Sequence, residues 1–214
     1  MPESGFCGKN QKLARPRLVL PPHAPGLRIG LLGGSFNPAH AAHRAISLLA
    51  MQRLGLDRVW WIVSPGNPLK DTSELPALSQ RMKQARALAR HPRIHVSDLE
   101  AQIGTRYTID TMEFLVQRLP RVHFVWLMGA DILAELHRWR DWRRLSSLMP
   151  LAVIDRGGWT QRYMAAPAAL ALGRFRLREA QAARLPVMSP PAWVMLHGRK
   201  SALSSTELRR KRVT

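Results

Sequence analysis

Two histidines, His40 and His43, stand three residues apart in the string GGSFNPAHAAH, residues 33–43. Asn37 followed by Pro38 is typical of a helix start, with Asn as the cap and Pro at the first helical position. Residues three apart lie on one face of a helix, and the N–H groups at a helix start favour a phosphate. The string therefore predicts a site where both histidines can point at one anion.

The same string has two plainer interpretations. A capped helix with two surface histidines would show the same pair, and a zinc site would need further ligands in a familiar spacing, which nearby residues do not supply. The string matches neither the G-x-G-x-x-G nor the GxxxxGK(S/T) phosphate loop. Gly33 and Gly34 are expected to let the backbone turn and approach a ligand closely.

Short apolar runs alternate with helical periodicity along the chain, which predicts strands alternating with helices. The predicted strands are residues 28–34, 59–65, 94–98, 122–129, 151–158 and 192–198. The predicted helices follow residue 38, the Ser79 cap, residues 105–111, residue 131 and residue 204, with residues 160–190 left ambiguous. This order predicts an α/β fold, a Rossmann-like doubly wound parallel sheet whose ligands bind beyond the carboxyl ends of the strands.

A second anion site is predicted after the last strand, in the string SSTELRRKR. Ser204 and Glu207 fit a capping box. The N–H groups of Ser205 and Thr206 would then face a phosphate, with Arg209 one turn further on. The alternative is an ordinary capped helix with a basic surface.

Three other residues stand near predicted strand ends. Asp131, in the string GAD, is either a ligand for hydroxyl groups or the cap of the next helix. Tyr107 and Trp139 are candidates to stack on a planar ring, although an aromatic residue at helical spacing is more often core. Trp139 and Trp142 lie in the string HRWRDWRR, among charges, where a core residue would be unusual.

Composition limits the classes of partner. The 214 residues carry a net charge of +19, which attracts phosphorylated small molecules, nucleic acid or acidic membranes. No apolar run approaches the ~20 residues that span a bilayer, and Cys7 is the single cysteine. A cytoplasmic protein is expected, with residues 1–26 as a flexible basic extension and 27–214 as one domain.

Residues 33–43 resemble the signature GGSF(D/N)PxHxGH of bacterial nicotinate-nucleotide adenylyltransferases, in the nucleotidyltransferase superfamily with the (H/T)xGH motif. The resemblance covers the chain from about residue 28 onward. It extends to TRYTIDT (105–111), GAD with Trp139 and Trp142, RGG (156–158) and LSSTELR (203–209). The sequence departs from the family pattern in Ala42 for the usual Gly, GNPLK for a PPHK-like loop, and Leu203 for Ile.

The resemblance implies a domain of the nucleotidyltransferase type that transfers AMP from ATP to nicotinate mononucleotide with Mg²⁺ and releases pyrophosphate. It implies catalytic roles for His40, His43 and Arg209. The residues it implies for ATP are Gly33, Gly34, Ser35, Phe36, His40, His43, Gly129, Asp131, Ser204, Ser205, Thr206 and Arg209. Those it implies for the mononucleotide are Asn37, Lys70, Tyr107, Thr108, Trp139 and Arg156.

No residue is assigned as a protein ligand of a metal. Two alternatives stay open: another adenylyltransferase of the superfamily, such as the phosphopantetheine type, and a basic nucleic-acid-binding protein. No zinc finger, RRM string or similar nucleic-acid-binding motif is found, and no apolar run is long enough to span a bilayer, so neither a specific nucleic-acid partner nor a membrane is expected. The sequence leaves open whether the chain forms a homo-oligomer.

Overall fold

In the part of the chain that the structure describes, seven parallel strands form one sheet in the order β3-β2-β1-β4-β5-β7-β6. The computed structural model describes residues 18–66, 75–155 and 163–198. The strands are β1 (Arg28–Gly34), β2 (Arg58–Val63), β3 (Ile94–Ser97), β4 (His123–Gly129), β5 (Leu151–Asp155), β6 (Arg176–Leu177) and β7 (Trp193–His197). Every pairing between neighbours is parallel, which confirms the predicted doubly wound α/β fold.

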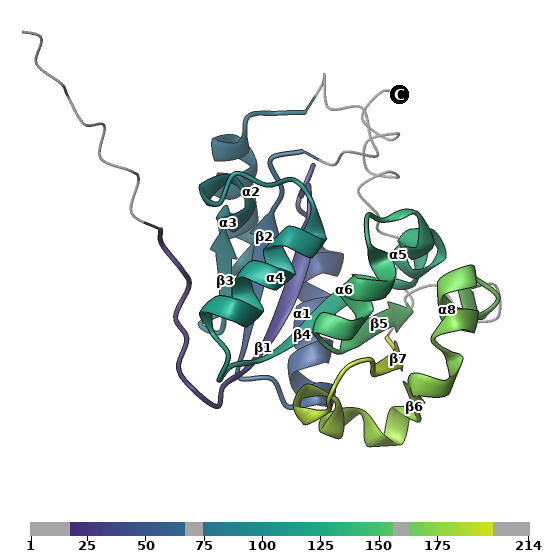
Figure 1. Cartoon of the computed structure of the whole chain (residues 1–214). Coiled ribbons are helices and arrows are strands. Elements are labelled where there is room, and N and C mark those ends of the chain that lie inside the picture. The colour runs from purple at the N-terminus through teal and green to yellow at the C-terminus, as the bar shows by residue number, and fades with distance from the viewer. Residues whose placement is uncertain (1–17, 67–74, 156–162, 199–214) are drawn as a thin grey trace, which may run out of the picture.

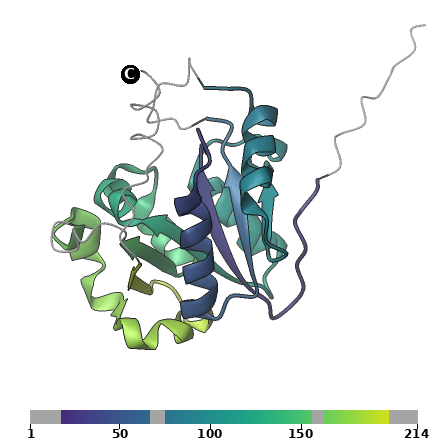
Figure 2. The same ribbon diagram turned by 180° about the vertical axis from the view of Figure 1, so that it is seen from behind.

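Helices cover both faces of the sheet, as Figures 1 and 2 show from opposite sides. The α-helices are α1 (Ala41–Leu54), α2 (Leu78–Ala89), α3 (Leu99–Gln102), α4 (Thr108–Arg118), α5 (Ala130–Glu135), α6 (Trp142–Leu148) and α8 (Pro167–Ala171). The 3-10 helices are η1 (Leu136–Arg138), η2 (Gly173–Phe175) and η3 (Glu179–Val187). Among the described helices, none is long and apolar enough to cross a membrane.

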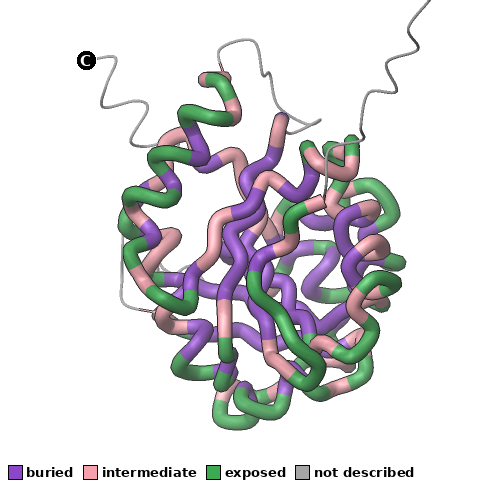
Figure 3. The backbone as a smooth tube through the Cα atoms, turned by 90° about the vertical axis from the view of Figure 1, so that its left-hand side faces the viewer, coloured by how far each residue is buried: buried purple, intermediate pink, exposed green. Residues whose placement is uncertain are grey.

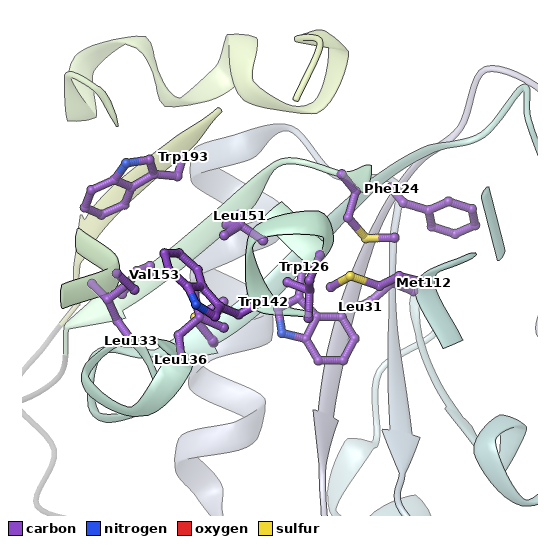
Figure 4. Close-up of a cluster of buried hydrophobic side chains, with 14 of the residues drawn as sticks. Leu31, Met112, Phe124, Trp126, Leu133, Leu136, Trp142, Leu151, Val153 and Trp193 are labelled. Carbon is purple, nitrogen blue, oxygen red and sulfur yellow. The ribbon is translucent and has the colours of Figure 1, made fainter. Parts of the chain in front are cut away.

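Two apolar clusters lie on the two faces of the sheet, and the strands between them are almost wholly buried (Figure 3). The cluster beneath α4, α5 and α6 includes Leu31, Met112, Trp126 and Trp142 (Figure 4). The other cluster lies beneath α1, α2 and η3. Strands buried on both faces of a sheet are continuous apolar runs in the sequence. Such runs could therefore be recognised, and a strand lies in each of the six predicted ranges.

The structure corrects several predicted boundaries. The first helix begins at Ala41 with His40 as its N-cap, so Asn37 and Pro38 belong to the preceding loop. Ala77, and not Ser79, caps α2. The ambiguous region 160–190 contains the short strand β6 as well as helices. Trp142 is 9% exposed and belongs to the core, although its neighbours in sequence are charged.

Part of the stretch predicted as a flexible extension packs on the fold. The Val19 main-chain N–H donates to Oε1 of Gln102 at 2.7 Å, and the His23 ring meets Trp60 edge-on with centroids 6.2 Å apart. Leu18 and Leu20 pack against the apolar cluster beneath α4. Residues 1–17 lie outside the described residues, and the division of the chain at residue 26 stays a prediction.

Candidate active site

The turn after β1 begins the candidate site. Gly34 pairs with Val63 of β2, and its carbonyl oxygen accepts from the Ser64 main-chain N–H at 2.9 Å. Phe36, two residues later, has φ of 48°, a left-handed conformation that is uncommon for a residue other than glycine. The residue that turns the chain is therefore Phe36, and not Gly33 or Gly34 as predicted.

Gly33 has a packing role instead. A Cβ at this position would lie 2.6 Å from the outer ring of Trp126 on the neighbouring strand, whereas one at Gly34 would be 3.7 Å from its nearest neighbour, Phe36. Trp126 is 2% exposed and is enclosed by the core. Residue 33 must consequently lack a side chain for the indole to fit.

His40 and His43 lie against each other at the start of α1, as the spacing predicted. Their ring centroids are 3.9 Å apart with planes inclined at 41°, and the His40 main-chain N–H donates to Nδ1 of His43 at 3.2 Å. His40 is the extended N-cap residue, so only His43 is within the helix. When its Nδ1 accepts this hydrogen bond, a neutral His43 ring carries its proton on Nε2.

Two aromatic side chains, Phe36 and Trp61, pack against the His43 ring. Phe36 is 1% exposed and packs on both His43, at 4.6 Å between centroids, and Trp61, at 5.2 Å, while the His43 and Trp61 rings lie 5.9 Å from each other. The Trp61 indole N–H donates to the Ser47 hydroxyl at 2.8 Å, and that hydroxyl donates to the His43 carbonyl oxygen at 2.9 Å. Phe36 is therefore a buried support for the histidine pair.

Ala42, where the family signature has Gly, is 1% exposed and packed in the fold. Helix α1 continues through this position without interruption from Ala41 to Leu54. The additional methyl group is accommodated.

Arg81 holds the loops around this site together, and the sequence reasoning missed it. Its side chain is 1% exposed, and its Nη1 donates to the carbonyl oxygens of Ser35 and Ser64, both at 2.7 Å. Nε donates to the Pro76 oxygen at 2.9 Å and Nη2 to the Pro65 oxygen at 3.3 Å. Burial lowers the pKa of the guanidinium below its ordinary value, although arginine remains charged.

Glu100 in α3 is a second buried charged residue that was not predicted. It is 4% exposed, and burial raises its pKa to about 7, while hydrogen bonds from Ser64 and Thr111 act in the opposite direction. The Thr111 hydroxyl lies 3.5 Å from Oε1. The burial of Arg81 could have been inferred from the sequence, because Arg81 stands four residues before the apolar Ala85 and so lies on the same face of the helix. Glu100 shows no comparable signal.

The start of α4 forms a separate polar and aromatic corner. Arg140 lies over the Tyr107 ring at 4.7 Å and 3.8 Å from the Asp110 carboxylate. Asp110 accepts from the Thr105 hydroxyl at 2.7 Å. The cavity here has a volume of about 510 Å³ and is lined by Ile103, Gly104, Thr105, Arg106, Tyr107, Asp110, Phe114 and Arg140.

Two other predicted substrate residues, Thr108 and Trp139, directly follow Tyr107 and directly precede Arg140 in the sequence. Thr108 is the first residue of α4, so it lies where the helix N–H groups favour an anion. Trp139 is partly buried and packs against the core edge. Tyr107 is 38% exposed, and Arg140 lies over its ring.

Asp131 is an exposed residue in the first turn of α5, and Gly129 at the end of β4 is the N-cap of that helix. The alternative interpretation of Asp131 as the cap is therefore wrong. Lys70, Arg156 and the residues Ser204, Ser205, Thr206 and Arg209 lie outside the described residues. Within the described ranges, no group of three or more His, Cys, Asp or Glu side chains is placed to hold a metal ion.

Known proteins match the chain over most of its length. Residues 31–211 match the cytidylyltransferase-like family. A relative from Bradyrhizobium sp. (strain ORS 278), named a probable nicotinate-nucleotide adenylyltransferase, is 57% identical over 183 residues, covering 86% of this chain and 95% of the relative. A relative of the same name from Methylorubrum extorquens (strain PA1) is 57% identical over 183 residues, covering 86% and 99%.

A solved structure shares the fold. It is the Plasmodium falciparum nicotinic acid mononucleotide adenylyltransferase complexed with NaAD, with a TM-score of 0.63 at 18% identity, covering 86% of this chain and 83% of that one. The chain therefore belongs to the cytidylyltransferase-like family and, within it, to the nicotinate-nucleotide adenylyltransferases. These are nucleotidyltransferases, so the predicted family and class of enzyme are confirmed.

Proposed function

We propose that this protein transfers the AMP group of ATP to nicotinate mononucleotide, giving nicotinate adenine dinucleotide and pyrophosphate. The observation that carries the proposal is the His40–His43 pair, 3.9 Å apart at the carboxyl end of β1, in a chain 57% identical to named nicotinate-nucleotide adenylyltransferases. The cytoplasmic location stays a prediction, and the oligomeric state stays open.

The reaction needs no nucleophile from the protein. The mononucleotide phosphate attacks the α-phosphorus in line. A new P–O bond joins the two nucleotides, and the bond from the α-phosphorus to pyrophosphate breaks, so negative charge increases on the leaving group. The work of the protein is then positioning and charge neutralisation.

We assign His40 and His43 to the triphosphate. His43 is suited to donate from Nε2, because its Nδ1 is already engaged by the His40 main chain. The family resemblance adds Arg209 as a further cationic donor and the helix start predicted at Ser204–Thr206 as a source of N–H donors. Mg²⁺ prefers oxygen ligands and retains several waters, so we propose that it enters on the ATP phosphates and neutralises their charge.

The nicotinate ring is proposed to bind where α4 begins. Trp139 and Tyr107 offer aromatic faces, and Thr108 with the first N–H groups of α4 offers donors to a carboxylate. A carboxylate is bound more favourably than a carboxamide at a helix start, because the partial charge there is positive. Asn37, Lys70 and Arg156 are proposed for the mononucleotide phosphate or ribose, and Asp131 for the ATP ribose.

Position-specific labelling tests this assignment. With ATP labelled at the α-phosphorus and nicotinate mononucleotide, the label should appear in the dinucleotide, whereas label at the γ-phosphorus should appear in pyrophosphate. Phosphopantetheine in place of the mononucleotide should give no labelled product. Label transferred to phosphopantetheine, or α-label found in free phosphate, would contradict the proposal.

A further inference from the structure

Arg140 lies at the wall of the cavity at the start of α4, in the turn between η1 and α6. Helices α4 and α6 pack against each other (Figure 1), so this turn is close to the start of α4. The Arg140 guanidinium lies over the Tyr107 ring at 4.7 Å from its centroid. It is also 3.8 Å from the Asp110 carboxylate. All three residues line the cavity, so a ligand there meets a cation, an aromatic ring and a carboxylate together.

The main chain that carries Arg140 is fixed. The Trp139 N–H donates to the Leu136 carbonyl oxygen at 3.0 Å, and the Trp142 N–H donates to the Trp139 carbonyl oxygen at 3.3 Å. Leu136 and Trp142 are buried in the core. Asp141, directly after Arg140, has φ of 48°, which is uncommon for a residue other than glycine and turns the chain at this point. The fold therefore sets where the Arg140 side chain begins.

The Arg140 side chain itself is held by weak contacts. It is 53% exposed, and its partners Asp110 and Asp141 are 37% and 60% exposed. The nitrogen–oxygen distances of 3.8 Å and 3.7 Å are longer than those of hydrogen bonds, and ion pairs between exposed side chains contribute little. The Asp110 carboxylate also accepts from the Thr105 hydroxyl at 2.7 Å. A carboxylate in the cavity can therefore replace these contacts with the shorter, bidentate pair that arginine forms.

We propose that Arg140 is a specificity-determining residue whose guanidinium pairs with the carboxylate of nicotinate mononucleotide. The inference rests on the proposed function, in which the pyridine ring binds where α4 begins, and it adds a side chain that recognises the acid. Nicotinamide differs from nicotinate in this group alone. Because arginine offers N–H donors and no acceptor, it satisfies both oxygens of a carboxylate. A carboxamide presents one oxygen to it, together with an NH₂ group that it cannot bind.

The ratio of kcat/KM for nicotinate mononucleotide to kcat/KM for nicotinamide mononucleotide tests this role. Arg140→Gln removes the charge and retains a polar side chain. We expect it to lower kcat/KM for the acid at least ~10-fold, the scale of one charge-assisted hydrogen bond, and that for the amide at most ~2-fold. Arg140→Lys should give a ratio between those of wild type and Arg140→Gln, because the ammonium keeps the charge and loses the planar fork. Pyrophosphate release measures all of these constants.

Arg143→Gln is the matched control. Arg143 is exposed and lies over the Trp142 ring at 4.6 Å, so the variant loses the same charge and the same kind of ring contact. Among the described residues that line the cavity, Arg143 is not included. We therefore expect its ratio to stay within ~2-fold of wild type, since a solvent-screened charge outside the cavity acts little on the carboxylate.

Asp110→Asn distinguishes recognition of the substrate from support of α4. It removes the carboxylate that competes for the guanidinium and retains an oxygen that can accept from the Thr105 hydroxyl. The preference for the acid should stay unchanged or rise. If Arg140 instead held α4 in place through Asp110, Arg140→Gln and Asp110→Asn would lower kcat/KM for both substrates together.

Four results would overturn the inference. They are a wild-type protein without preference for the acid, an Arg140→Gln with an unchanged ratio, an equal fall of the ratio in Arg143→Gln, and a fall of the ratio in Asp110→Asn. Equal losses on both substrates in Arg140→Gln leave the ratio unchanged, and they would assign the charge to the phosphate that both mononucleotides carry or to support of α4. A wild-type protein that releases no pyrophosphate with either mononucleotide would instead overturn the proposed function.

Discussion

The main-chain N–H of His40 donates to Nδ1 of His43 at 3.2 Å, and the two rings lie 3.9 Å apart. One histidine therefore caps the helix while the second is oriented by it. Nδ1 also lies 3.3 Å from the His40 carbonyl oxygen, so the His40 main chain engages Nδ1 in either tautomer, and Nε2 is the remaining ring nitrogen. This is the atom that the account assigns to the triphosphate.

The two ring nitrogens of His43 can be tested separately. Asn places an amide atom near the position of Nδ1, whereas Gln extends one to the position of Nε2. We expect His43→Ala and His43→Asn to lose at least ~100-fold in kcat, the scale of one lost charge-stabilising donor, and His43→Gln to retain more activity than His43→Asn. Steady-state pyrophosphate release measures this. An Asn variant more active than the Gln variant would show that Nδ1 is the important atom.

Gly33 and Gly34 should respond differently to a methyl group. Gly33→Ala would place Cβ 2.6 Å from the buried Trp126 ring, whereas Gly34→Ala meets its nearest neighbour at 3.7 Å. We expect Gly33→Ala to lower the free energy of unfolding by about 1–3 kcal/mol, as overpacking does, and Gly34→Ala to change it little. Urea titration measures both variants. Equal losses would contradict the packing argument.

The two tryptophans of HRWRDWRR should separate into a ligand residue and a core residue. Trp139 is partly buried at the core edge, whereas Trp142 is 9% exposed within the cluster. Trp139→Ala should raise KM for nicotinate mononucleotide at least ~10-fold with a small change in Tm. Trp142→Ala should cost about 3–5 kcal/mol of stability. A Trp139→Ala variant with wild-type KM would remove this residue from the proposed pyridine site.

Glu100 should make the protein less stable as the pH rises. Its pKa in the folded protein is raised from 4.5 to about 7 by burial, so the folded state binds the proton more tightly than the unfolded state. The stabilisation that the protonated Glu100 contributes is fully present below pH 4.5. It is lost as the pH rises through about 7, which lowers the free energy of unfolding by about 3 kcal/mol in total.

Glu100→Gln isolates this effect, because the amide does not titrate. The Tm of the variant minus that of wild type should be near zero at pH 5 and should rise by several degrees at pH 8. Differential scanning calorimetry at both values checks this. A difference in Tm that is the same at pH 5 and pH 8 would contradict the raised pKa.

Much of the fold could be predicted from the sequence because parallel strands buried on both faces are continuous apolar runs. Residues 28–34 and 122–129 illustrate this, since β1 and β4 occupy almost the same ranges. The start of α1 was predicted less accurately. Asn37 and Pro38 have the residue types of a helix start, but Phe36 turns the chain in order to stack on Trp61, and the helix begins only at Ala41.

The histidine pair was predictable, whereas its support was not. The spacing of His40 and His43 is a local pattern, but the partners of Arg81 are main-chain oxygens of loops up to 46 residues away. Main-chain acceptors leave no residue type to recognise in a sequence. The burial of Glu100 could not be predicted either, because its side-chain neighbour at 3.5 Å is the Thr111 hydroxyl of another helix.

The most direct measurement is pyrophosphate release from ATP and Mg²⁺ with nicotinate mononucleotide, nicotinamide mononucleotide or phosphopantetheine as the acceptor. The account predicts release with the nicotinate substrate, with a kcat/KM well above that for the amide, and none with phosphopantetheine. Equal kcat/KM for nicotinate and amide would contradict the assignment of the start of α4 to a carboxylate. No release with any of the three acceptors would contradict the central claim that this chain is an adenylyltransferase acting on the pyridine mononucleotide.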